Sequence, residues 1–108
     1  MESKILDQMH RRMVLNFLDM VILMELRKRS LSGYDVIDFV HNKFHMLIST
    51  GTVYSNLYVL ERNELIRGKL DQRRRVYTLT EQGKENVKAF LNSKDKILGL
   101  VLNLFIGE

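Results

Sequence analysis

Cysteine, proline and tryptophan are absent from this sequence of 108 residues. Without cysteine the chain has no disulfide, thiolate nucleophile or cysteine zinc site, which excludes redox chemistry and agrees with a reducing compartment. Without tryptophan, one well-suited stacking group for flat ligands is missing. The sequence also lacks a nucleophile elbow and a glycine-rich phosphate loop. We therefore expect no enzymatic activity and no cofactor.

Long uninterrupted apolar runs are lacking too. Polar residues such as Asn16, Asp19 and Glu25 interrupt the most apolar stretch, and no basic segment leads into a signal-type apolar core. We expect a cytoplasmic protein that is neither exported nor inserted in a membrane. Hydrophobic residues make up 45% and charged residues 28% of the chain, which is typical of one folded domain.

The net charge of +4 is concentrated in one short segment. Residues 1–61 hold seven basic and seven acidic residues, and residues 76–108 hold four of each. The surplus of positive charge lies in residues 62–75, which hold six basic and two acidic residues. A localised cationic segment on a neutral body indicates contact with a polyanion.

The first helix is predicted over residues 4–29, bent or split near residues 10–12, and contains no proline or glycine. Between Met13 and Leu26, 11 of 14 residues are apolar. A helix that is apolar nearly all round must be covered on more than one side, and a domain of this size can hardly do that alone. The pattern therefore indicates a partner surface.

Two shorter helices follow. Residues 33–44 predict an amphipathic helix, preceded by Ser32 and Asp35 in the spacing of a capping box. Ser49 is the expected N-cap of a third helix over residues 50–63. Its inward stripe is predicted to be Val53, Leu57 and Leu60. The opposite face is small, hydroxylated and nearly free of acid, so it can approach another backbone closely.

The cationic segment falls on a predicted β-hairpin. Residues 65–70 and 75–79 read as strands, with residues 71–74 as the loop between them. Thr80 is the expected N-cap of a last helix that weakens at residues 92–93 and then continues. Eight of the ten residues 97–106 are apolar, too few to span a bilayer, so they also need a partner surface.

The predicted fold class is therefore mainly α with a small β-hairpin, in the order α-α-α-β-β-α. We expect a single domain over residues 1–108. Within it, residues 1–29 form the N-terminal helix, residues 32–79 the two shorter helices and the hairpin, and residues 80–108 the C-terminal helix.

This order and several motifs resemble the PadR-like transcriptional regulators, a winged helix-turn-helix family, from about Phe17 to the early 90s. The anchors are Gly33-Tyr34, the run at residues 49–54, the pair Leu65-Ile66, and residues 75–83 after the basic loop. Two positions depart from the family pattern: Thr50 replaces a common proline and Glu64 a usual glycine. A left-handed residue there would cost about 1 kcal/mol unless Asn63 takes that conformation instead.

The resemblance implies a homodimeric regulator of double-stranded DNA, by expectation a repressor, whose third helix enters the major groove and whose hairpin wing touches the backbone or minor groove. Arginine forks match phosphate oxygens, and Asn56 can pair with adenine edges. The candidate DNA-binding residues are Thr50, Thr52, Tyr54, Ser55, Asn56, Arg62, Arg73, Arg74 and Arg75. The competing interpretations are helix capping for the hydroxyl side chains, partial core packing for Tyr54 and a solvated hairpin tip for the arginines.

The resemblance also implies that the terminal helices make the dimer. The candidate dimerisation residues are Met9, Met13, Phe17, Met20, Phe90, Ile97, Val101, Leu104 and Phe105. A methionine-lined cavity between subunits would admit a small apolar effector, as some relatives bind aromatic compounds there.

Other classes of function stay open. Asp38, His41 and His45 can share one helical face, but a surface helix explains them equally well and we assign no metal site. A winged-helix protein-interaction module would use the same apolar ends and basic hairpin to hold other chains. A ligand-sensing dimer would bind DNA only secondarily.

Overall fold

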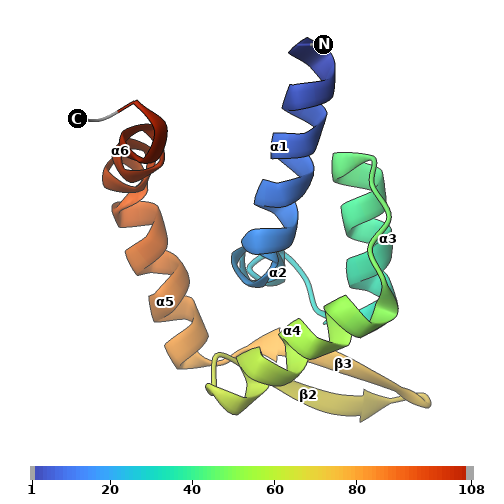
Figure 1. Ribbon diagram of the computed structural model, residues 1–108. Helices are drawn as coiled ribbons and strands as arrows, with labels where there is room; N and C mark the ends of the chain where they lie inside the picture. The colour runs from blue at the N-terminus through green and yellow to red at the C-terminus, as the bar shows by residue number, and fades with distance from the viewer. Residues whose placement is uncertain (1, 107–108) are drawn as a thin grey trace.

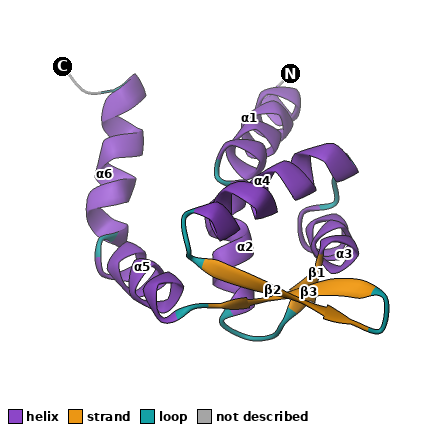
Figure 2. Cartoon of the chain, turned by 90° about the horizontal axis from the view of Figure 1, so that it is seen from below, coloured by secondary structure: helices purple, strands orange, loops and turns teal. Residues whose placement is uncertain are grey.

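The computed structural model describes residues 2–106 as six helices and a three-stranded antiparallel sheet in the order β1-β3-β2 (Figures 1 and 2). The elements are α1 (Glu2–Asn16), α2 (Leu18–Leu26), β1 (Leu31–Ser32), α3 (Gly33–Phe44), α4 (Thr50–Arg62), β2 (Ile66–Asp71), β3 (Arg74–Leu79), α5 (Glu81–Asn92) and α6 (Lys94–Phe105). Residues 1, 107 and 108, at the outer limits of the expected segments, lie outside the described residues.

The first helical region is split into two helices, and the predicted position of the break, near residues 10–12, was wrong. The break lies at Phe17, whose φ of −109° and ψ of 24° depart from helical values. The Val21 N–H still donates to the Phe17 carbonyl at 3.0 Å, so the helix is kinked and not unravelled. The kink turns α2 into the core, where Leu18 and Ile22 are buried, while most of α1 is exposed. Neither proline nor glycine marks this site, because core packing sets the break.

The helix-turn-helix unit has the predicted limits because its caps are local. The Ser32 hydroxyl accepts from the Asp35 N–H, and the Asp35 carboxylate accepts from the Ser32 N–H, which completes the capping box of α3. Ser49 caps α4 by accepting from the Thr52 N–H at 3.1 Å. Val53 and Leu57 are buried, as the inward stripe predicted.

The sheet contains one strand more than predicted. Residues 31–32, between the two predicted helices, form β1 and pair with β3, with Leu31 opposite Tyr77. Two residues are too short for a recognisable strand pattern. The hairpin loop is also shorter than expected, because β2 and β3 pair as far as Asp71 opposite Arg74. The turn is left with Gln72 and Arg73, both at positive φ, 49° and 73°.

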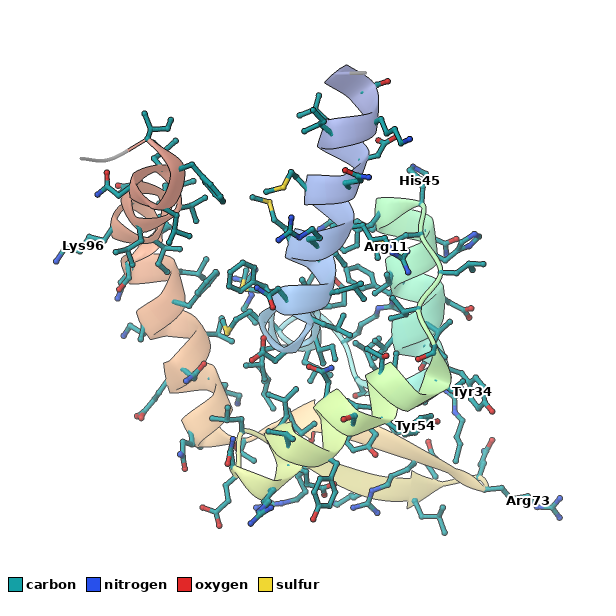
Figure 3. The ribbon with its side chains drawn as sticks, viewed as in Figure 1. Arg11, Tyr34, His45, Tyr54, Arg73 and Lys96 are labelled. Carbon is teal, nitrogen blue, oxygen red and sulfur yellow. The ribbon has the colours of Figure 1, made fainter. Side chains whose placement is uncertain are left out.

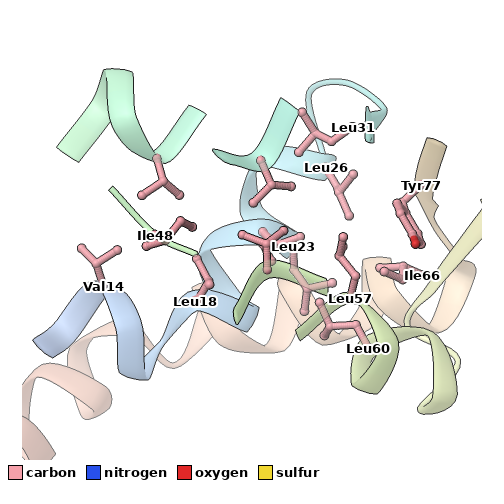
Figure 4. Packing of buried hydrophobic residues seen from close by; sticks show 14 of the residues in the cluster. Val14, Leu18, Leu23, Leu26, Leu31, Ile48, Leu57, Leu60, Ile66 and Tyr77 are labelled. Carbon is pink, nitrogen blue, oxygen red and sulfur yellow. The ribbon is translucent and has the colours of Figure 1, made fainter. Parts of the chain in front are cut away.

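One hydrophobic core joins these elements (Figure 4). It takes side chains from α1 to α4, from all three strands and from α5. The buried apolar residues are Val14, Leu18, Ile22, Leu23, Leu26, Leu31, Val36, Val40, Met46, Ile48, Val53, Leu57, Leu60, Ile66, Tyr77 and Val87. The α4 helix is thus fixed against the core through one face, and its other face is left exposed.

The C-terminal region is two helices, which corrects the single helix expected over residues 80–108. The break falls at Ser93, inside the weak point predicted at residues 92–93. In Figure 1, α5 and α6 extend along one side of the molecule and stand apart from α1. No residue of α6 is buried.

Candidate nucleic-acid interface

The exposed face of α4 is small and hydroxylated in its first half. Thr50 and Ser55 are exposed there, while Thr52 and Asn56 are half-buried. Thr52 receives a hydrogen bond from the Ser49 hydroxyl at 2.8 Å, and its carbonyl accepts from Asn56 Nδ2 at 2.9 Å. Helix capping therefore occupies Thr52 in this state, and the Asn56 amide has to turn away from the helix to reach another group.

Tyr54 links the two helices of the helix-turn-helix unit. Its ring lies against Gly33 at the start of α3, so closely that a Cβ at Gly33 would clash with it. It also meets Tyr34 edge to face, with ring centroids 6.5 Å apart (Figure 3). Tyr54 remains 40% exposed. Tyr54 therefore packs between the two helices through the hydroxyl end of its ring while part of the residue stays exposed.

The three arginines of the wing have different surroundings. Arg73 lies at the tip and points away from the hairpin (Figure 3). Arg74 Nη2 is 3.7 Å from Asp35 Oδ2 at the start of α3. Arg75 Nη2 donates to Glu61 Oε2 on α4 at 2.8 Å. The structure thus separates a set that the sequence presents as equivalent.

Two pKa shifts follow from these contacts. The hydrogen bond from the Ser32 backbone N–H holds the pKa of Asp35 below its ordinary value of 3.8, and the charge of Arg74 acts in the same direction. The hydrogen bond with Glu61 raises the pKa of the Arg75 guanidinium. Each of these two contacts thus joins an arginine of the hairpin to a carboxylate on another element.

Some exposed residues near this surface are not among the candidate DNA-binding residues. Tyr34 is 64%, Tyr58 65% and Val59 50% exposed, and Lys69 is exposed on β2. Helical spacing places Tyr58 and Val59 on the outward face of α4, one turn after Tyr54 and Ser55. Arg62, which was predicted, is exposed at the end of α4.

The α4 helix and the hairpin lie together at one end of the molecule, and the outer parts of α1 and α6 lie toward the other end (Figure 1). All nine candidate dimerisation residues are exposed or half-buried. The exposed ones are Met13, Phe17, Leu104 and Phe105, and the half-buried ones are Met9, Met20, Phe90, Ile97 and Val101.

A cavity of about 340 Å³ lies between the core helices and the C-terminal pair. Its wall is mostly apolar and aromatic, with three basic side chains. The lining residues are Phe17, Met20, Val21, Met24, Glu25, Arg27, Lys28, Phe39, Lys43, Phe44, Phe90, Ile97 and Val101. Two methionines, Met20 and Met24, belong to this lining.

Among residues 2–106, no three His, Asp or Glu side chains gather as metal ligands would. Within the same residues, no helix has the length and apolar character that a bilayer crossing requires.

The three-helix core, the exposed helix and the basic hairpin beside it define a winged helix-turn-helix protein of the DNA-binding regulator class. A sequence model described as the transcriptional regulator PadR-like family matches residues 22–89. The chain belongs to this family, as the motifs indicated. No curated protein sequence matches it significantly.

Solved structures agree with this assignment. A PadR-like transcriptional regulator from Bacillus cereus is 25% identical, with a TM-score of 0.73 over 90% of this chain and 99% of its own. A PadR family regulator from Eggerthella lenta shares the fold, at 20% identity and a TM-score of 0.76 over 99% of this chain and 97% of its own.

A third relative has been solved with ligands. PadR of Bacillus subtilis in complex with operator DNA is 27% identical, with a TM-score of 0.59 over 68% of this chain and 46% of its own. The same protein in complex with p-coumaric acid is 28% identical, with a TM-score of 0.60 over 71% of this chain and 42% of its own.

Proposed function

We propose that the protein is a homodimeric, sequence-specific repressor that binds double-stranded DNA through α4 and the β2–β3 wing. The observation that carries the proposal is the juxtaposition of α4, with its small hydroxylated face, and a hairpin whose tip presents Arg73 at the same end of the molecule. The operator complex of the Bacillus subtilis relative supports this proposal.

In this proposal α4 enters the major groove. Thr50, Thr52, Ser55 and Asn56 supply hydroxyl, methyl and amide groups to base edges or phosphates, since side chains of this size and kind reach base edges there. Tyr54 and Arg62 contact the backbone on either side of the groove. Arg73 and Arg74 carry the wing's positive charge to phosphate oxygens.

A dimer is proposed because both ends of the chain leave apolar surface uncovered. Ile5 and Leu6 on α1 are 55% and 63% exposed, and Leu104 and Phe105 on α6 are 75% and 69% exposed. An apolar surface of this kind marks an interaction site in a soluble protein. A second copy would cover it and place two α4 helices in successive major grooves, about 34 Å apart.

Selection of bound sequences from a random duplex library tests the proposal most directly. Two symmetric half-sites separated by about one helical turn are expected. Failure to bind any duplex at low salt would refute the DNA-binding function. Salt-resistant binding to a protein partner in place of DNA would favour an interaction module.

Substitutions should separate backbone contacts from base readout. Arg73→Ala is expected to weaken binding to all duplexes alike and to lower the slope of log K against log salt by about 1 per protomer, because one phosphate contact is lost. Ser55→Ala should instead change which sequence is preferred. Titration of selected and random duplexes over a range of salt concentrations measures both effects.

The cavity supports a second proposal, that a small apolar effector binds beside α2. Its volume of about 340 Å³ lies within the usual range of ligand pockets, roughly 300–1,000 Å³. The p-coumaric acid complex of the Bacillus subtilis relative supports this class of ligand. A rise in melting temperature with phenolic acids or hydrophobic cations is expected, and the absence of any shift across such a panel would contradict the proposal.

A further inference from the structure

Glu61 is the only residue of α4 whose carboxylate faces the wing, and one of its oxygens contacts both wing strands. Glu61 Oε2 accepts from the Gly68 N–H of β2 at 3.0 Å and from Arg75 Nη2 of β3 at 2.8 Å. The Glu61 side chain is 32% exposed, so the pair is partly shielded from water. A single atom thus ties the exposed helix to each strand of the hairpin.

Gly68 and Tyr77 give the Arg75 side chain its position. Gly68 stands opposite Tyr77 in the sheet, and a Cβ at Gly68 would lie 2.9 Å from both Arg75 Cζ and Tyr77 Cε1. The guanidinium therefore crosses the space that a side chain at Gly68 would fill. It lies 5.8 Å from the centroid of the Tyr77 ring, which is itself buried in the core at 5% exposure.

Apart from strand pairing and the contact of Arg74 with Asp35 at 3.7 Å, the outer half of the hairpin has no apolar anchor. Ile66 and Tyr77 anchor the inner half in the core, whereas Leu70 is 76% exposed and the residues from Lys69 to Arg75 are all exposed. A two-stranded ribbon without an apolar anchor is marginally stable and free to bend or twist. The contact from Glu61 acts where the anchored part ends.

We propose that Glu61 and Arg75, with the Gly68 amide, form a clamp that sets the angle of the wing relative to α4, and that Arg75 is a positioning residue and not a phosphate contact. The proposal rests on the proposed DNA-binding function. The guanidinium is already matched by a carboxylate, so a phosphate would have to displace Glu61 to use it. Arg73, at the tip, and Arg74, whose contact with Asp35 is longer at 3.7 Å, remain the wing's phosphate-binding arginines in the proposed function.

The clamp predicts that two variants lose affinity for DNA without a change in salt dependence. Glu61→Gln and Arg75→Gln should each weaken binding to the selected operator by about two- to fivefold. The slope of log K against log salt should remain that of the wild type, because no phosphate contact is lost. The double variant should bind DNA no more weakly than the weaker-binding single variant, because each change removes the same interaction between Glu61 and Arg75.

If Arg75 instead contacts phosphate, the two variants should behave differently. Glu61→Gln would then tighten DNA binding, because it releases the arginine, and Arg75→Gln would lower the slope of log K against log salt, as Arg73→Ala does. Either result overturns the clamp. Glu64→Gln is the matched control for charge. It removes a carboxylate from the same region without touching Arg75, and it should bind at least as well as the wild type.

A DNA-free measurement separates this proposal from the proposed function. The Gly68 amide should exchange its hydrogen faster in Glu61→Ala than in the wild type, and the NMR signal of the Arg75 guanidinium should lose its protection. Unchanged exchange at both groups would refute the clamp even if DNA binds. Urea unfolding of every variant confirms that the chain still folds.

Discussion

Among residues 2–106, four residues other than glycine take left-handed backbone conformations, namely His45, Glu64, Gln72 and Arg73. Each costs roughly 1–2 kcal/mol, because Cβ then crowds the backbone. Two of them form the wing tip, where consecutive positive φ values make the tight turn that presents Arg73. Backbone strain of this kind persists where the rest of the structure requires it. Here β2 and β3 pair as far as Asp71 and Arg74, which leaves two residues for the turn.

Glu64→Gly should relieve one of these strains. Glu64 has a φ of 62° and follows α4 at the position where a helix prefers glycine, while Asn63 stays at −83°. Glu64 itself therefore takes the left-handed conformation. We expect Glu64→Gly to raise the free energy of unfolding by about 1 kcal/mol in urea titrations. Asn63→Gly, one residue earlier, should lower it, and equal effects of the two changes would contradict the interpretation.

Gly33→Ala should disturb the junction of α3 and α4. A Cβ at this buried position meets the Tyr54 ring, so Tyr54 has to move, and overpacking of this kind costs about 1–3 kcal/mol. Gly51→Ala is the matched control, because its Cβ would meet only the Ser49 hydroxyl at 3.9 Å. The control should keep or raise stability through better helix propensity. Urea midpoints of the two variants give the comparison.

The arginines of the wing show how far residue-level prediction can reach. Charge counting placed residues 73–75 in one cationic segment, residues 62–75, and all three are exposed on the hairpin. Their partners, Asp35 and Glu61, come from distant parts of the sequence. Because only the fold brings these carboxylates to the wing, the sequence could not distinguish a free arginine from a paired one.

At the scale of elements, helices whose ends are set by neighbouring residues were predicted well, and features set by distant parts of the chain were not. The α3 and α4 helices were predicted to within one residue, because Ser32 and Ser49 cap them locally. The β1 strand was missed because its partner is β3, far along the chain, and the kink at Phe17 because core packing causes it. Local signals determined the elements that hold the candidate site.

The α3 cap should make stability depend on acid pH. The folded pKa of Asp35 lies below its ordinary 3.8, so its contribution is fully present above that pH and is lost as pH falls through the folded value. Urea unfolding between pH 6 and pH 2 should show this loss, and Asp35→Asn should reduce it. Asp38→Asn, which alters an exposed carboxylate of the same helix, should keep the wild-type profile.

At the scale of the whole molecule, the two ends have opposite character. The end with α4 and the wing carries the hydroxyl and cationic surface, and the other end carries uncovered apolar side chains on α1 and α6. Composition predicted both ends, because neither apolar helix could be hidden in one small domain. How the partner chain sits on them was not readable from the sequence, since helical spacing alone leaves many packings open.

Leu104→Asp tests the proposed pairing of chains. Leu104 is 75% exposed, so the change should cost a single folded chain little, but a charge in an apolar interface should prevent association. Sedimentation should then give the one-chain mass of 12.8 kDa, with weaker operator binding. Lys96→Asp is the control, because Lys96 points away from the rest of the molecule (Figure 3) and should leave the mass unchanged.

The α6 helix has a consequence of its own. It spans 12 residues and buries none of them. Helices of this length seldom persist in water without a packed neighbour. Forming the first turn is unfavourable in free energy, and the few hydrogen bonds of the following turns do not offset it. In the proposed dimer, the folding of α6 and the association of the two chains would therefore be coupled. Dilution would separate the chains and unfold α6, while the half with α4 and the wing stayed folded.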